Sequence, residues 1–97
     1  MPDIAGFRNN VERQRFELTE HELTAFADYR CNGSELAILH VEAPVPLRGK
    51  GTAERLMHGI ASHARQHRLT IMPLCGYARA WLRRHRKWND LLADGSR

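Results

Sequence analysis

The stretch Pro46–Ala53 constrains this chain more than any other. It lies between an apolar run at Leu36–Val41 and an amphipathic run at Glu54–His67. A buried strand, a glycine-containing turn and a helix start leave several backbone amides without partners inside the helix. Gly49 and Gly51 let the chain turn tightly and let an anion approach without meeting a Cβ atom. The stretch therefore predicts a turn that binds a diphosphate.

The same pattern also fits a tight strand-to-helix turn that binds nothing. Its spacing matches neither the P-loop, Gly-x-x-x-x-Gly-Lys-Ser/Thr, nor the dinucleotide-binding fingerprint. Other features of the chain must decide between the two interpretations.

Length and charge narrow the class of protein. The chain has 97 residues, which predicts a single domain over residues 1–97 with frayed ends at 1–8 and 94–97. Two cysteines are too few for a disulfide scaffold, and we find no signal peptide or membrane-spanning run, so we expect a reducing cytoplasm. A formal net charge of +4 favours an anionic partner: nucleic acid, a phosphorylated cofactor or an acidic protein.

The hydrophobic pattern predicts the element order β-β-β-α-β-α. The expected strands are 10–18, 23–29, 36–41 and 69–72, and the expected helices are 54–67 and 77–85. One apolar stripe with helical spacing marks the first helix, formed by Ala53, Leu56, Met57, Ile60, Ala61 and Ala64. The pattern predicts an α+β fold, an antiparallel meander joined to a mixed sheet with helices packed on it.

Four stretches carry a resemblance to a known family. Arg48–Ala53 fits the Arg-x-x-Gly-x-Ala motif of the GNAT N-acetyltransferases. Together with His40–Pro44, Ile71–Tyr77 and Arg84–Trp88, it is similar to a small single-domain GNAT-like group of the YjdJ type, over about residues 16–92. Gly76 and Arg86 stand where that group usually has proline. The first departure loosens the backbone beside a cysteine.

The resemblance implies a minimal GNAT-like fold that binds acetyl-CoA. In such folds the strand at 36–41 splays from the strand at 69–72, and the pantetheine arm lies in the wedge between them. The diphosphate rests mainly on backbone amides at the head of the first helix. Onto this sequence the resemblance carries a pantetheine segment of Ala43, Pro44 and Val45, and a diphosphate segment of Arg48, Gly49, Lys50, Gly51, Thr52 and Ala53.

Four residues are catalytic candidates, each with a structural alternative. Cys75 follows a buried strand where the resemblance places the wedge, so its thiol either accepts an acetyl group or lines the thioester channel. His40 and Glu42 are two residues apart on one strand face and could take a proton from an amine; otherwise they are a core histidine and a solvated charge. Tyr77 could donate a proton to a leaving thiolate, or simply pack at a helix start.

The remaining histidines and basic residues suggest no further site. His58, His63 and His67 lack the partners of a metal motif, so we expect no metal and solvated histidines on the helix face. A basic run includes two tryptophans and could bind nucleic acid or the cofactor's 3′-phosphate, although core tryptophans and charges at a helix end explain it more simply. The run comprises Arg79, Trp81, Arg83, Arg84, His85, Arg86, Lys87 and Trp88.

The sequence therefore predicts an acetyl-CoA-binding N-acetyltransferase acting on an unidentified amine, as a monomer or weak dimer. The short link between the first strands leaves little room for an acceptor pocket, which suits a protein or bulky amine. Two alternatives stay open: a CoA-binding module without catalysis, and a small basic nucleic-acid-binding domain.

Overall fold

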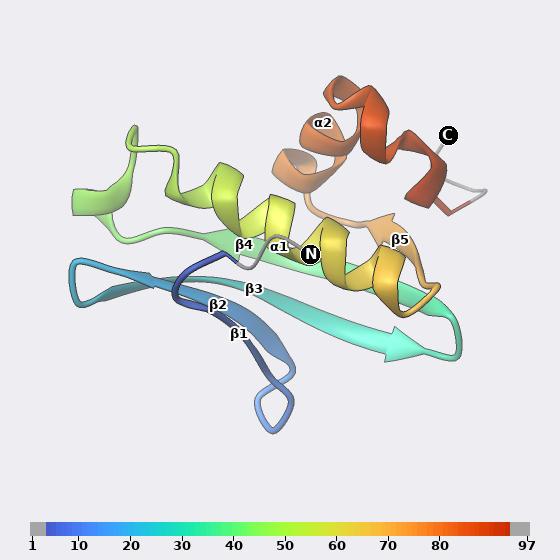
Figure 1. Ribbon diagram of the computed structural model, residues 1–97, viewed down its shortest axis with the longest axis horizontal. Helices are drawn as coiled ribbons and strands as arrows, with labels where there is room; N and C mark the ends of the chain where they lie inside the picture. Colours follow the sequence, from blue (N-terminus) through green and yellow to red (C-terminus); the bar gives the residue numbers. More distant parts are fainter. Residues whose placement is uncertain (1–3, 94–97) are drawn as a thin grey trace.

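The computed structural model describes residues 4–93. The chain folds into a five-stranded mixed sheet with helices packed on one side (Figure 1). The strands follow each other in chain order as β1 (Phe7–Asn10), β2 (Arg15–Glu20), β3 (Leu23–Asn32), β4 (Glu35–Glu42) and β5 (Thr70–Pro73). The first four are antiparallel, and β5 runs parallel to β4 after the crossover helix α1 (Thr52–Gln66). The helix α2 (Gly76–Arg84) and the 3₁₀ segments η1 (Val45–Leu47) and η2 (Arg86–Leu91) complete the chain. The predicted α+β fold is confirmed.

The front of the sheet has one strand more than predicted. A single strand over 10–18 was expected, but the chain turns at 11–14 and pairs β1 with β2, with Phe7 opposite Leu18 and Asn10 opposite Arg15. That prediction is wrong because β1 carries only one strongly apolar residue, too few for its period to be read. Of the segment 1–8 that was expected to fray, residues 4–6 form a turn, and Phe7 and Arg8 lie in β1. Residues 1–3 and the other predicted frayed end, 94–97, lie outside the described residues.

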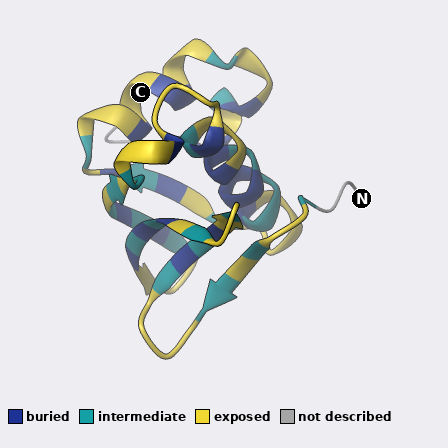
Figure 2. Cartoon of the chain, turned by 90° about the vertical axis from the view of Figure 1, so that its left-hand side faces the viewer, coloured by how far each residue is buried: buried dark blue, intermediate teal, exposed yellow. Residues whose placement is uncertain are grey.

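The core lies between the sheet and α1. The predicted stripe is buried at Leu56, Met57, Ile60, Ala61 and Ala64, and it covers the alternating inward residues of β2 and β3. Figure 2 shows buried positions gathered between helices and sheet, while turn tips and outer helix surfaces are exposed. Each fully buried large apolar side chain contributes about 1.5–3 kcal/mol, which holds α1 against the sheet.

The C-terminal segment closes the open end of this core. Trp81 and Trp88 are 0% and 5% exposed, and the amide of Ala93 donates to the carbonyl of Ile71 at 2.8 Å. Both tryptophans are therefore packing residues, as the simpler interpretation of the basic run predicted. Among residues 4–93, no helix has both the length and the hydropathy needed to span a bilayer.

Candidate functional site

The strands β4 and β5 separate at one end of the sheet. Their pairing ends at Ile38 opposite Pro73, followed by one bond from the Leu74 amide to the Ile38 carbonyl at 2.9 Å. Strand β4 continues to Glu42, whereas the other chain turns away at Cys75 into α2. This is the predicted splayed strand pair, and it leaves the last four residues of β4 without β5 beside them.

A β-bulge marks the point of separation. His40 lies opposite Asp28 and Ile38 lies opposite Tyr29, so Leu39 is the extra residue on β4. A bulge bends the strand and changes where the following side chains point. The bulge thus places His40 and Glu42 on the sheet face that turns away from α1, opposite Asp28 and Phe26.

The glycine turn at Arg48–Gly51, just before α1, has the backbone that an anion site needs. Gly49 and Gly51 have φ of 78° and 79°, in the left-handed region that glycine adopts without strain. Nothing lies within 4 Å of the position that a Cβ on Gly49 would take. Gly51 caps α1 without any side-chain hydrogen bond, so the first amides of the helix are not capped by a side chain.

A cavity of about 340 Å³ joins this turn to the end of β4 and the start of α2. It is lined by most of the predicted cofactor residues and by one catalytic candidate, Tyr77. The lining residues are Ala43, Leu47, Arg48, Gly49, Gly51, Thr52, Ala53, Glu54 and Tyr77. A hollow of this kind, beside free helix amides, suits a phosphorylated ligand.

Hydrogen bonds from the chain just after it already occupy the backbone carbonyls of the segment predicted to bind pantetheine. The Pro44 and Val45 carbonyls accept from the amides of Leu47 and Arg48 at 2.9 and 3.1 Å, and the Ala43 carbonyl accepts from Arg48 Nε at 3.0 Å. Pro44, Val45 and Lys50 do not belong to the cavity lining. The bond to the Ala43 carbonyl folds Arg48, one of the two basic side chains in the turn, back onto the end of β4.

A carboxylate that the sequence analysis missed holds the turn in place. Glu20, the last residue of β2, accepts from Thr52 Oγ1 at 2.7 Å and from Arg55 Nε and Nη2 at 2.7 and 2.8 Å. Arg55 also donates to the Lys50 carbonyl at 3.0 Å. The Arg55 and Thr52 hydrogen bonds lower the pKa of Glu20 to about 2. Thr52, predicted to bind cofactor, has its hydroxyl committed to Glu20, which leaves its amide for a ligand.

The four catalytic candidates do not all meet in one place. His40 Nε2 and Glu42 Oε1 are 2.9 Å apart and exposed, so the shared strand face is confirmed and the core alternative for His40 is wrong. Tyr77 lines the cavity, and its pKa is raised by burial first and by the charge of Glu54 second. Cys75 is half-buried against the core at the mouth of the strand separation, outside the cavity lining.

Of the three helix-face histidines expected to be solvated, His67 is exposed, whereas His58 and His63 are half-buried. The His58 ring packs edge-on against Trp81 at 4.8 Å, and the His63 ring against Phe16 at 5.1 Å. Burial lowers the pKa of both. Sequence spacing could not reveal this, because Trp81 and Phe16 come from other elements.

Comparisons with known proteins agree with this geometry. Residues 15–91 match the family of the GCN5-related N-acetyl-transferases. The chain belongs to this family. A similar solved structure is the solution NMR structure of a GCN5-like protein from Staphylococcus aureus, with a TM-score of 0.66 and 21% identity. That match covers 93% of this chain and 91% of the other, so this GCN5-related domain has the same fold over nearly its whole length.

Proposed function

We propose that this domain binds acetyl-CoA and transfers its acetyl group to an amine, as a small single-domain member of the GCN5-related family. The observation that carries the proposal is the cavity at the head of α1, which collects the end of β4, the double-glycine turn and Tyr77 around uncapped helix amides. Family membership supports acetyl-CoA over other phosphorylated ligands.

The backbone around Gly49–Ala53 would hold the diphosphate. Amides at a helix N-terminus carry partial positive charge and bind phosphate oxygens without any side chain. The Glu20–Arg55 pair keeps these amides in position from outside the cavity, and its charges largely offset each other. Lys50 is exposed in the same turn and adds a mobile positive charge.

The separation of β4 from β5 would hold the pantetheine arm. An extended chain with amide groups can pair with an open strand edge as another strand would. Residues 39–42 of β4 offer that edge, include His40 and Glu42, and lead directly to Ala43 in the cavity lining. Bound acetyl-CoA supplies a thioester, which is an activated acyl donor.

Two groups of this chain are suited to moving protons. An ionised Glu42 only accepts hydrogen bonds, so the Nε2 of a neutral His40 carries the proton and its Nδ1 can accept one from an incoming amine. The raised pKa of Tyr77 keeps its Oη protonated at neutral pH and available as a donor. Cys75 lies at the mouth of the strand separation, just before α2 and outside the cavity lining, where its thiol would border the thioester rather than the diphosphate.

A second candidate function is CoA binding without acetyl transfer. The links between the first four strands are short, with only His21 and Glu22 between β2 and β3, and residues 7–42 contain no helix that could build an acceptor pocket. Nucleic-acid binding is less well supported, because both tryptophans of the basic run are buried and unavailable for stacking.

Isothermal titration with acetyl-CoA tests the site through a matched pair of glycine variants. Gly49 and Gly33 both have positive φ, and a Cβ on either meets nothing within 4 Å, but only Gly49 lines the cavity. Gly49→Ala should weaken binding about tenfold or more, the value of one lost charge-assisted hydrogen bond, whereas Gly33→Ala should bind like the wild type. Equal affinities in both variants would contradict the proposed site. Gly51 is a poorer choice, because a Cβ there would lie 3.0 Å from Arg55 Nη1.

Intact mass spectrometry and an amine panel then separate the two candidate functions. Transfer predicts an acetylated amine, and Cys75→Ala should reduce transfer more than binding. Tight CoA binding with no acetylated amine and no acetylated Cys75 would establish the binding module instead.

A further inference from the structure

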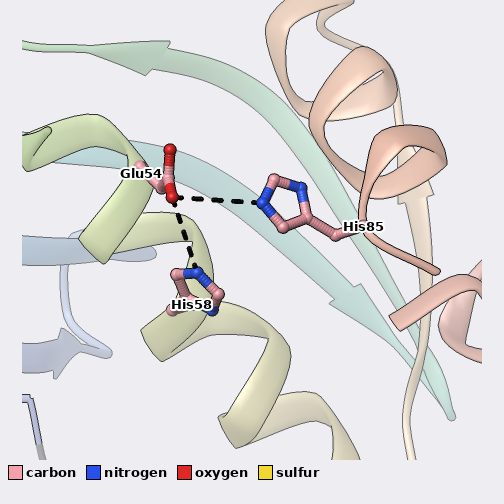
Figure 3. A group of neighbouring side chains, drawn as sticks. All are labelled: Glu54, His58 and His85. Carbon is pink, nitrogen blue, oxygen red and sulfur yellow. Dashed lines mark ion pairs between the residues drawn. The ribbon is translucent and has the colours of Figure 1, made fainter. Parts of the chain in front are cut away.

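We propose that Glu54, His58 and His85 form a binding site for Zn²⁺ or a similar borderline divalent cation. Glu54 and His58 lie one turn apart on α1, and His85 follows the end of α2 (Figure 3). Their ligand atoms all lie within 4.8 Å of one another. Two imidazoles and one carboxylate are a ligand set that zinc accepts, with a further position left for water.

The spacing of the three groups suits a metal better than a direct contact. His58 Nε2 and His85 Nε2 lie 3.9 and 4.0 Å from the same oxygen, Glu54 Oε2. Both distances are too long for a hydrogen bond. In a tetrahedral zinc site with bonds near 2.0–2.1 Å, neighbouring ligand atoms are about 3.3 Å apart. Small side-chain rotations would bring these two pairs to that separation, and the third pair, His58 and His85, starts within 4.8 Å.

A second, independent observation points the ligand atom of His85 into the cluster. His85 Nδ1 lies 2.8 Å from the backbone carbonyl of Trp81. A carbonyl can only accept, so Nδ1 donates its hydrogen, and in the neutral ring Nε2 carries a lone pair toward Glu54. A backbone carbonyl on the second nitrogen is the usual outer-shell partner of a metal-bound histidine.

The surroundings hold His58 in place and admit a cation. The Trp81 and His85 rings stack on each other at a centroid distance of 4.0 Å, and the His58 ring packs edge-on against both, at 4.8 and 5.5 Å. The three side chains are 25–53% exposed, so an ion can enter from solvent. Lys87 is a nearby positive charge that would repel a bound cation; its Nζ lies 4.9 Å from the Trp88 ring centroid. Glu54 supplies the compensating negative charge.

The chemistry of the set selects the cation class. Mg²⁺ and Ca²⁺ prefer oxygen ligands, whereas two imidazole nitrogens favour zinc, nickel or copper. The other helix-face histidines, His63 and His67, also stand one turn apart, with ring centroids stacked at 4.2 Å. Within residues 4–93, no third ligand residue groups with them. That pair offers a competing, weaker site and hence a control.

Isothermal titration of the whole chain with ZnCl₂ tests the proposal without reference to acetyl transfer. We expect one Zn²⁺ per chain, with the Kd raised at least about tenfold by Glu54→Gln, His58→Ala or His85→Ala, since even outer-shell losses cost 10–100-fold. The double variant His63→Ala/His67→Ala should keep wild-type affinity. Glu54→Gln is isosteric and exposed, so it remains informative if a histidine variant fails to fold.

Two results would overturn the site. One is no zinc binding by the wild type at millimolar ZnCl₂. The other is zinc binding that survives Glu54→Gln but is lost in the His63/His67 double variant.

Discussion

At the residue scale, the ion pair between Glu20 and Arg55 holds the glycine turn before α1. Glu20 is 21% exposed and receives three hydrogen bonds from Thr52 and Arg55. Its pKa is lowered from 4.5 to about 2, chiefly by Arg55 and then by Thr52. A depressed carboxyl pKa adds stability that is present above the unfolded-state value and is lost as pH falls toward the folded-state value.

Glu20→Gln should therefore destabilise the domain at neutral pH and matter less in acid. We expect a loss of about 1–2 kcal/mol in the free energy of unfolding at pH 7, below what the whole pKa shift would give because Arg55 is exposed to solvent. The gap between the two proteins should narrow between pH 4.5 and 2. Urea unfolding across this range measures it, and a gap that does not depend on pH would contradict the ion-pair explanation.

Contacts between residues far apart in the chain were the part of the site that the sequence predicted least well. The glycine turn, Tyr77 and the paired faces of His40 and Glu42 follow from local spacing, and the structure places them as expected. Glu20 is 32 residues from Thr52, and His85 is 27 residues from His58, so only the tertiary fold brings each pair together. No local period encodes such contacts.

At the element scale, Gly59 is where β1 comes close to α1. A Cβ on Gly59 would lie 2.5 Å from the Phe7 ring, so the glycine makes room for the strand that the sequence analysis missed. Strong periods, in α1 and in the meander, were enough to predict the fold class. A four-residue edge strand with one packed aromatic carries too little pattern to be predicted.

The effect of Gly59→Ala on the free energy of unfolding should change sign when Phe7 is removed. Alanine favours a helix over glycine by about 1 kcal/mol, but overpacking costs about 1–3 kcal/mol, so we expect net destabilisation in the wild type. In a Phe7→Ala background the same change should stabilise by up to about 1 kcal/mol. Urea unfolding of the four proteins measures the coupling, and additive effects would show that Phe7 does not pack on Gly59.

At the scale of the whole molecule, one ligand would tie together segments that the sheet leaves apart. The cavity joins the end of β4, the glycine turn, the start of α1 and Tyr77 at the start of α2. A ligand that spans these segments adds contacts present only in the folded chain, and its binding must therefore raise the free energy of unfolding.

Coenzyme A at 100 times its Kd should stabilise the domain by about 2.7 kcal/mol. For a domain of this size, each kcal/mol raises the Tm by about 4–8 °C, so a rise of about 10–20 °C is expected in a thermal unfolding scan. Gly49→Ala should show a smaller rise at the same CoA concentration, and Gly33→Ala the full rise above its own baseline. A single-stranded oligonucleotide near 150 mM salt should have little effect, because the tryptophans that would stack on bases are in the core. A large rise in Tm with the oligonucleotide and none with CoA would contradict the CoA site at the head of α1 and favour nucleic-acid binding by the basic surface of α2.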